Sequence, residues 1–192
     1  MRVLIVAEGV HEREGALPAL VQRLNPRITS FECRNANDQN LSAIHGSGKG
    51  FYGRAYRWLR VAEDEGFDAI ILVIDQDGER SRRHQINKAQ DGEGFGHPHA
   101  LGVAIERFNA WMLADEQALS VALGHPVQTQ PDPESIKDPK AQCKTLHDNS
   151  PSDRALREVY EIVATETRLD TLRQRCPKGF APFAERVEAL NP

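Results

Sequence analysis

Two stretches of the chain are apolar at nearly every position instead of alternating with polar residues. They are residues 2–7 (Arg-Val-Leu-Ile-Val-Ala) and residues 68–74 (Asp-Ala-Ile-Ile-Leu-Val-Ile). A short run of Ile, Leu and Val without alternation is typical of a strand buried on both faces, as in a parallel sheet covered by helices. Residues 27–34 and 99–105 predict two further strands.

Helical spacing of apolar residues separates these strands. It runs over residues 10–24 and again over residues 51–65, where Gly66 ends the pattern. The polar, glycine-rich residues 35–50 predict a loop, and residues 79–96 predict part helix and part loop. Strands that alternate with helices in this way predict an α/β fold with a mainly parallel sheet of about four strands and right-handed crossovers.

Beyond residue 110 the pattern is helical, with helices expected around residues 153–164, 168–175 and 181–190. We therefore expect an α/β core over residues 1–125 and a helical extension over residues 126–192, packed together as a single compact domain. Helix starts are predicted at four places: N-caps at Asp115, Asp132 and Asp138, each of the last two followed by proline, and a capping-box variant at residues 150–153. Trp111 is expected in the core.

The first candidate for chemistry is Asp75-Gln76-Asp77-Gly78, directly after the strand at residues 68–74. Strand residues two apart point the same way, so Asp75 and Asp77 should project together at the carboxyl edge, where open α/β folds bind ligands. Adjacent carboxylates repel each other unless a cation or a shared proton compensates them, and such oxygen ligands suit Mg²⁺ or Mn²⁺. The alternative is a solvated turn, for which Asp and Gly are ordinary residues.

Other predicted strands also end in carboxylates. Glu8 precedes Gly9 at the end of the first strand, Glu12 follows in the first helical turn, and Glu106 follows the strand at residues 99–105. Parallel strands share one carboxyl edge, so these side chains are expected to face Asp75 and Asp77. The alternative for Glu12 and Glu106 is a structural role, because the helix dipole favours acids at a helix start.

A run of cations follows the two aspartates. It comprises Arg80, Arg82, Arg83 and Lys88, and Arg54 on the preceding helix could extend it. Arginines close to an acidic metal site could hold phosphate groups of a substrate. The alternative is a solvated helix face, which is the usual role of a charge run.

Residues 45–50 (His-Gly-Ser-Gly-Lys-Gly) look at first like a phosphate-binding P-loop. The pattern fails, because it requires glycine at position 43 and Ser or Thr at position 50, where the chain has Ala43 and Gly50. A flexible loop is the prediction here. His97 and His99 have no third metal ligand at motif spacing, so we predict a transition from loop to strand there.

The chain has 192 residues, of which 40% are hydrophobic and 27% charged, as expected for one globular domain. No apolar run is long enough for a membrane helix, so no membrane partner is expected. Cys33, Cys143 and Cys176 lack paired spacing, which favours reduced thiols in the cytoplasm over a zinc ribbon. The net charge of −4 means that a nucleic-acid partner would need a local basic patch.

The combination of a Glu-Gly after the first strand and an Asp-x-Asp after a later one resembles the Toprim fold of primases, topoisomerases and overcoming-lysogenization nucleases. More specifically, the chain resembles domain-of-unknown-function family 4276. The matching segments cover nearly the whole chain: residues 6–9 with Glu12, residues 74–77, residues 105–115, and residues 172–177 with Phe183. That family usually has Glu where Asn109 stands, which removes one acid from the site, and Pro where Glu116 stands.

The resemblance implies metal-dependent phosphodiester chemistry, most readily a Toprim-type nuclease of a prokaryotic defence module that acts on nucleic acid. Asp75 and Asp77 would hold Mg²⁺ or Mn²⁺, while Glu8 would complete the metal site or act as general acid or base. Glu106 and Glu12 would bind a second ion or complete the ligands of the first. The alternatives are a non-catalytic binding or regulatory subunit that works beside an ATPase, and phosphoryl chemistry on a small molecule.

Overall fold

The computed structural model describes residues 1–38, 41, 50–92 and 96–191. The glycine-rich residues 45–49 and most of the loop predicted at residues 35–50 lie outside the described residues. Within the described residues, no helix combines the length and the apolar character that crossing a membrane requires.

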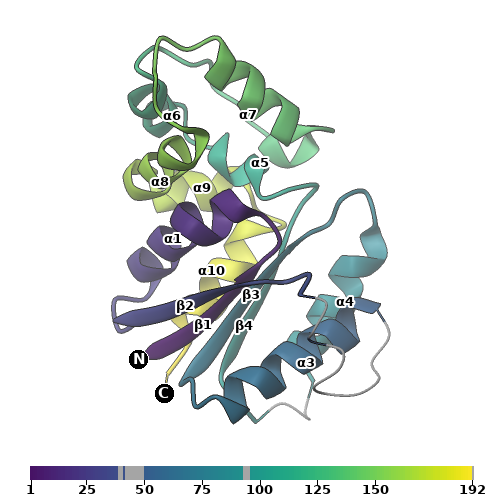
Figure 1. The fold of residues 1–192 in the computed structure, drawn as a ribbon. Helices are drawn as coiled ribbons and strands as arrows, with labels where there is room; N and C mark the ends of the chain where they lie inside the picture. Colours follow the sequence, from purple (N-terminus) through teal and green to yellow (C-terminus); the bar gives the residue numbers. More distant parts are fainter. Residues whose placement is uncertain (39–40, 42–49, 93–95, 192) are drawn as a thin grey trace.

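Four parallel strands form one sheet in the order β2-β1-β3-β4 (Figure 1). This confirms the predicted α/β fold with a parallel sheet. The second strand begins later than predicted, because residues 25–28 form a turn in which the Ile28 N–H donates to the Asn25 carbonyl at 3.0 Å. The strands are β1 (Arg2–Ala7), β2 (Ser30–Asn35), β3 (Ala69–Asp75) and β4 (His99–Ala104).

Helices cover both faces of the sheet, which explains why the central strands carry apolar residues on both sides. Val3 and Ile5 of β1 pack in one hydrophobic cluster, whereas Leu4 and Val6 pack in a second. Figure 1 shows one pair of helices on each side of the sheet. The first cluster includes side chains of α1 (Leu17–Leu24) and α10 (Phe180–Glu188), and the second includes those of α3 (Gly50–Asp64) and α4 (Arg80–Gln90).

The helix predicted over residues 10–24 forms with one irregularity. A π-helical turn, η1 (Glu12–Ala16), precedes α1. Such turns are rare and are frequent at functional sites. Nothing in the hydrophobic spacing of residues 10–24 signals it.

The rest of the chain is helical, as predicted. Helix α8 packs against η1 and α6, while α10 returns to pack against β4. Helices α5 to α9 gather at one end of the molecule, beyond α1 (Figure 1). Trp111 is completely buried, as expected. The bounds are α5 (Asn109–Met112), α6 (Glu116–Leu123), the 3₁₀ turn η2 (Pro133–Ser135), α7 (Pro139–Asp148), α8 (Leu156–Glu166) and α9 (Leu169–Arg175).

Two predicted helix caps are confirmed. The Asp115 carboxylate accepts a hydrogen bond from the Gln117 N–H, and Asp138 accepts one from the Ala141 N–H at 3.0 Å. Asp115 is almost fully buried and also pairs with the Arg168 guanidinium at 2.9 Å, which joins α6 to the segment before α9. These caps therefore set where the helical extension lies.

The other two predicted helix starts are wrong. After Asp132 only a single 3₁₀ turn forms, and the aspartate side chain does not cap it. Residues 150–153 do not cap α8, which begins at Leu156. There, Glu158 accepts a hydrogen bond from the Ala155 N–H at 3.2 Å, so the helix start lies three residues further along than the proline pattern predicts.

Candidate functional site

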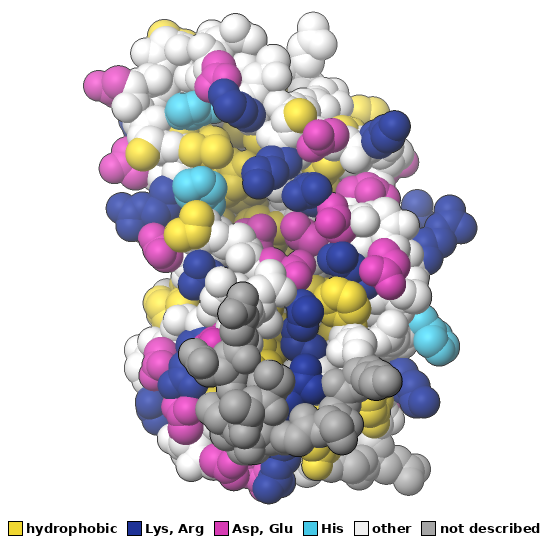
Figure 2. Space-filling model, turned by 45° about the vertical axis from the view of Figure 1, so that its right-hand side comes forward, with side chains coloured by type: hydrophobic (Ala, Val, Ile, Leu, Met, Phe, Trp, Pro, Cys, Tyr) yellow, Lys and Arg dark blue, Asp and Glu magenta, His cyan; other side chains and the backbone are white. Residues whose placement is uncertain are grey.

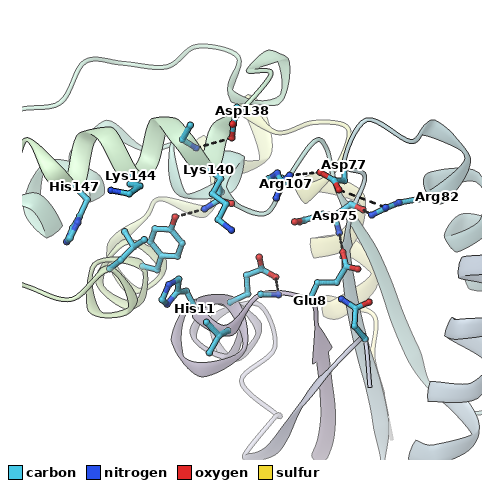
Figure 3. A pocket seen from close by; sticks show the side chains of 18 of the residues that line it. Glu8, His11, Asp75, Asp77, Arg82, Arg107, Asp138, Lys140, Lys144 and His147 are labelled. Carbon is cyan, nitrogen blue, oxygen red and sulfur yellow. Dashed lines mark hydrogen bonds and ion pairs between the residues drawn. The ribbon is translucent and has the colours of Figure 1, made fainter. Parts of the chain in front are cut away.

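A cavity of about 1020 Å³ lies between the carboxyl edge of the sheet and helix α7. Figure 2 shows Asp and Glu side chains gathered in its middle, with Lys and Arg side chains around them. One side, which we call the sheet-edge wall, carries four acids (Figure 3). The opposite side carries two lysines and a histidine, which we call the α7 wall, together with Asp138 and Asp148. The sheet-edge wall consists of Glu8, Glu12, Asp75 and Asp77, and the α7 wall consists of Lys140, Lys144 and His147.

Main-chain donors of neighbouring strand ends orient two of the acids. The Asp75 N–H donates to Glu8 Oε2 at 2.9 Å, and the Phe108 N–H donates to Asp75 Oδ1 at 2.8 Å. Because β1, β3 and β4 are adjacent and parallel, each carboxylate can reach the backbone of the next strand end. The parallel sheet thus brings Glu8 and Asp75 together, as the sequence predicts.

Asp77 reaches the same cavity by a different route from the one predicted. β3 ends at Asp75, so strand alternation does not extend to Asp77. Instead, Asp77 has a left-handed backbone with φ 52°, and its N–H donates to the Glu106 carbonyl at 2.8 Å. Glu106 is left-handed as well, with φ 56°. Such backbones are uncommon outside glycine and often mark functional sites.

The left-handed Glu106 changes which side chain faces the cavity. Arg107, and not Glu106, is among the cavity-lining residues that the structure describes. Arg107 forms an ion pair with Asp77 Oδ1 at 2.7 Å. The structure therefore places Glu106 beside the site, where its carbonyl holds Asp77, and it brings an unpredicted arginine to the acids.

Glu12 is the most buried acid of the sheet-edge wall, with 7% of its surface exposed. Its Oε2 accepts from the Gly9 N–H at 3.1 Å. A Cβ atom on residue 9 would lie 2.5 Å from Glu12 Oε1, so only glycine allows this approach. Burial, followed by the charges of Asp75 and Glu8, raises the pKa of Glu12 to about 8.

Asp75 is also harder to ionise than a free aspartate. Burial raises its pKa to about 6, and the nearby charges of Glu8 and Asp77 act in the same direction. The Phe108 N–H and the Arg107 guanidinium oppose this rise without cancelling it. After burial, the charges of Glu8 and Asp77 thus add to the cost of ionising Asp75, and an added cation would lower that cost.

Two predicted arginines line the cavity. Arg54 lies 3.4 Å from Glu8 Oε1, and Arg82 donates to the Asp75 carbonyl at 3.1 Å. Both guanidinium groups lie over the ring of Phe51, each at 4.6 Å from its centre. These contacts hold the two arginines beside the acids.

The other predicted cations are not among the cavity-lining residues of the described chain. Arg80 is exposed at the start of α4, and Lys88 lies over the Tyr52 ring at 5.5 Å. The charge of Arg83 acts on Glu134, away from the acids. A helix turns its successive residues through 100°, so only one side chain of this run, Arg82, points to the cavity.

The α7 wall was not anticipated from the sequence. Lys140, Lys144 and His147 have the spacing i, i+4, i+7, which places them on one helix face, and that was the available signal. Figure 3 shows α7 across the cavity from Asp75 and Glu8. Two further lining residues were also not predicted. These are Asn109 and Tyr160, and the Asn109 side chain donates a hydrogen bond to the Tyr160 hydroxyl.

The carboxylates have the donor type and charge for a divalent cation, but their present partners are main-chain N–H groups and, at Glu8 and Asp77, arginines. Among the described residues, no group of three or more His, Cys, Asp or Glu side chains is arranged to hold a metal ion. Arg107 and Arg54 occupy oxygen atoms of Asp77 and Glu8. A metal ion bound through these oxygen atoms would compete with the two arginines for them.

No family model, curated protein or solved structure matched the chain. The likeness to Toprim proteins rests on the sequence segments quoted above.

Proposed function

We propose that the cavity is the active site of a metal-dependent phosphodiesterase that acts on nucleic acid. The observation that carries the proposal is the meeting of Glu8, Asp75 and Asp77 in one cavity at the carboxyl edge of parallel strands. Ligands of open α/β sheets bind at this edge. The Toprim resemblance, which places the same three residues in its motifs, supports the assignment.

Glu8, Asp75 and Asp77 would hold Mg²⁺ or Mn²⁺, with Glu12 behind them. The raised pKa of Asp75 supports this, because a bound cation would relieve the repulsion that contributes to it. Such an ion would supply positive charge to a phosphate and Lewis acidity to an attacking water. Glu106 contributes its carbonyl to the position of Asp77 in this arrangement.

The arginines of the cavity would bind the phosphate. Arg54, Arg82 and Arg107 already lie beside the carboxylates, at the distances given above. A guanidinium group offers two parallel donors that match two phosphate oxygens. When Arg107 leaves Asp77 it can donate to a substrate oxygen instead, so the same motion would free a metal ligand and provide a phosphate contact.

The proposal predicts metal-dependent cleavage. Labelled single-stranded and duplex DNA and RNA would be incubated with Mn²⁺, Mg²⁺ or EDTA, and cleavage should require the ion and disappear in Asp75→Ala. Melting temperature should rise with added Mn²⁺ in the wild type by mass action, and Asp77→Asn should lose most of that rise. Asp153→Asn, an exposed aspartate outside the cavity, is the matched control.

The second candidate is a non-catalytic binding subunit that works beside an ATPase. The ion pairs of Arg107 and Arg54 favour it, because they show how the acids can be compensated without a metal. This candidate predicts an intact fold, and no turnover of nucleic acid or nucleotides by the isolated chain at any metal concentration. Cleavage that appears only after an ATPase is added would favour a conditional nuclease instead.

A further inference from the structure

The cations of the cavity differ in how far they are already engaged. Arg54, Arg82 and Arg107 each contact a carboxylate, a carbonyl or an aromatic ring of the cavity. In the α7 wall, Lys144 forms an ion pair with Asp148 one helical turn away. These four side chains are held by partners within the protein.

Lys140 is different. Among the described residues, its ammonium group forms no hydrogen bond and no ion pair within the usual distance limits. Its charge nevertheless reaches across the cavity, because it acts on Glu12 and lowers the pKa of that carboxyl. An exposed, unpaired ammonium on the rim of an acidic cavity is available to a ligand anion.

The cavity limits what that ligand can be. Its volume of about 1020 Å³ is at the upper end of the range for sites that enclose one small molecule. Such a space accepts a nucleotide unit, whereas a double helix, which carries two paired strands, does not fit inside it. The ligand must also carry an anionic group where it meets Lys140. Where it meets the acids of the sheet-edge wall, it must not add negative charge that no cation compensates.

We propose that Lys140 binds a phosphate group of a nucleotide unit, supplied by a single strand or a free nucleotide, and so positions it against the sheet-edge wall. This rests on the proposed function of the same site. Lys140 belongs to the helical extension, and the carboxylates belong to the sheet. The two parts of the chain therefore hold one substrate between them, and the site favours single strands over duplexes.

Binding should be measured by fluorescence anisotropy on the full chain carrying Asp77→Asn, in EDTA, so that neither cleavage nor a bound ion interferes. The probe is a labelled oligothymidylate, and unlabelled duplex and thymidine monophosphate are competitors. Lys140→Ala should raise the Kd about tenfold, and Lys140→Glu more. Loss of one phosphate contact should reduce the slope of log K against log salt by about 0.7 for a single strand.

Lys137→Ala is the matched control, because Lys137 is exposed, lies three residues away and does not line the cavity. It should leave Kd and salt slope unchanged. If thymidine monophosphate competes as well as unlabelled oligothymidylate does, the phosphate bound by Lys140 is that of a free nucleotide. If it competes much less well, the phosphate belongs to a single strand. Either result supports the contact between Lys140 and a phosphate.

Three results would overturn the inference: Lys140→Ala binding like Lys137→Ala, duplex binding as tightly as single strand, or no binding of any probe. If Lys140 only compensates Glu12, its removal will change stability and leave the salt slope intact. Cleavage is not part of this measurement. A chain that binds through Lys140 and never cleaves would refute the proposed hydrolysis alone, and a chain that cleaves without needing Lys140 would refute this inference alone.

Discussion

The two walls of the cavity are built in opposite ways. In the sheet-edge wall, Glu8, Glu12 and Asp75 each accept a main-chain N–H, so the sheet and the turn at Gly9 hold them in place. In the α7 wall, His147 contacts the Arg154 carbonyl, but Lys144 is held only by a neighbour on its own helix, and 70% of its side chain is exposed. The contrast between the two walls therefore concerns the lysines of the α7 wall. The first wall is preorganised and the second is adaptable.

The backbone shows the same contrast. Among the described residues, the only non-glycine positions with positive φ are Asp77 and Glu106, and both lie at the sheet edge. Helix α7 has a proline at its first turn and a regular aspartate cap at Asp138. Strain and charge repulsion are thus concentrated where a small, hard ion would bind, and the adaptable wall faces the variable part of a ligand.

The largest expected effect tests how strongly burial, followed by the charges of Asp75 and Glu8, disfavours the ionised form of Glu12 in the sheet-edge wall. The unfolded chain ionises Glu12 near its ordinary value of 4.5, whereas the folded chain does so at about 8. The folded state therefore binds more protons between these values, and metal-free stability should fall as pH rises through that window. Glu12→Gln should match the wild type at pH 5 and exceed it at pH 8, by on the order of 3 kcal/mol or roughly 6–12 °C in Tm.

The comparison needs a neighbouring acid as control. Glu14 lies in the same turn, is exposed and does not line the cavity, so Glu14→Gln should keep the pH dependence of the wild type. Thermal unfolding in EDTA between pH 5 and pH 8 measures both variants. A wild type whose Tm is flat across this range would mean that folding does not raise the pKa of Glu12, and that burial in the sheet-edge wall does not disfavour its ionised form.

A smaller effect is expected from disturbing the support of the wall. In Gly9→Ala the new methyl group would occupy the place of Glu12 Oε1, so the carboxylate must move and lose its bond to the residue 9 N–H. We expect the free energy of unfolding to fall by about 1–2 kcal/mol at pH 5, where Glu12 is protonated in the folded protein. Gly96→Ala, where a Cβ would meet no atom of the described residues within 4 Å, is the control. Equal denaturation midpoints for the two variants would contradict the role of Gly9.

The contrast between the walls also explains what the sequence could predict. The buried strands need unbroken apolar runs, so their ends, and with them Glu8 and Asp75, can be located without a structure. The exchange of Arg107 for Glu106 in the cavity could not be predicted, because it depends on the backbone angle of one residue. The same holds for Asp77, which reaches the cavity through a turn and not through strand alternation.

The α7 wall depends on tertiary packing, which the spacing of residues along the chain does not reveal. Its spacing of i, i+4, i+7 shows that Lys140, Lys144 and His147 share a helix face, but not what that face opposes. The cation run of α4 was predicted to line the site instead, because it is close in sequence to the aspartates. Of that run only Arg82 lines the cavity. Proximity along the chain was a poor guide here, because a helix spreads adjacent residues around its axis.

The smallest effect should come from the adaptable wall itself. The ion pair of Lys144 with Asp148 is a solvent-exposed i, i+4 pair, and such pairs contribute about 0.3–0.5 kcal/mol. Lys144→Ala should therefore shift Tm by less than about 2 °C. It should also weaken oligothymidylate binding less than Lys140→Ala does, since Lys144 must first leave Asp148 to reach a ligand. Asp148→Ala serves as the counterpart: it frees Lys144, and it should leave binding unchanged or make it tighter. If Lys144→Ala instead destabilised the protein by more than 1 kcal/mol, or weakened binding as much as Lys140→Ala, the α7 wall would be as firmly built as the sheet edge, and the two walls would not differ in the way their contacts indicate.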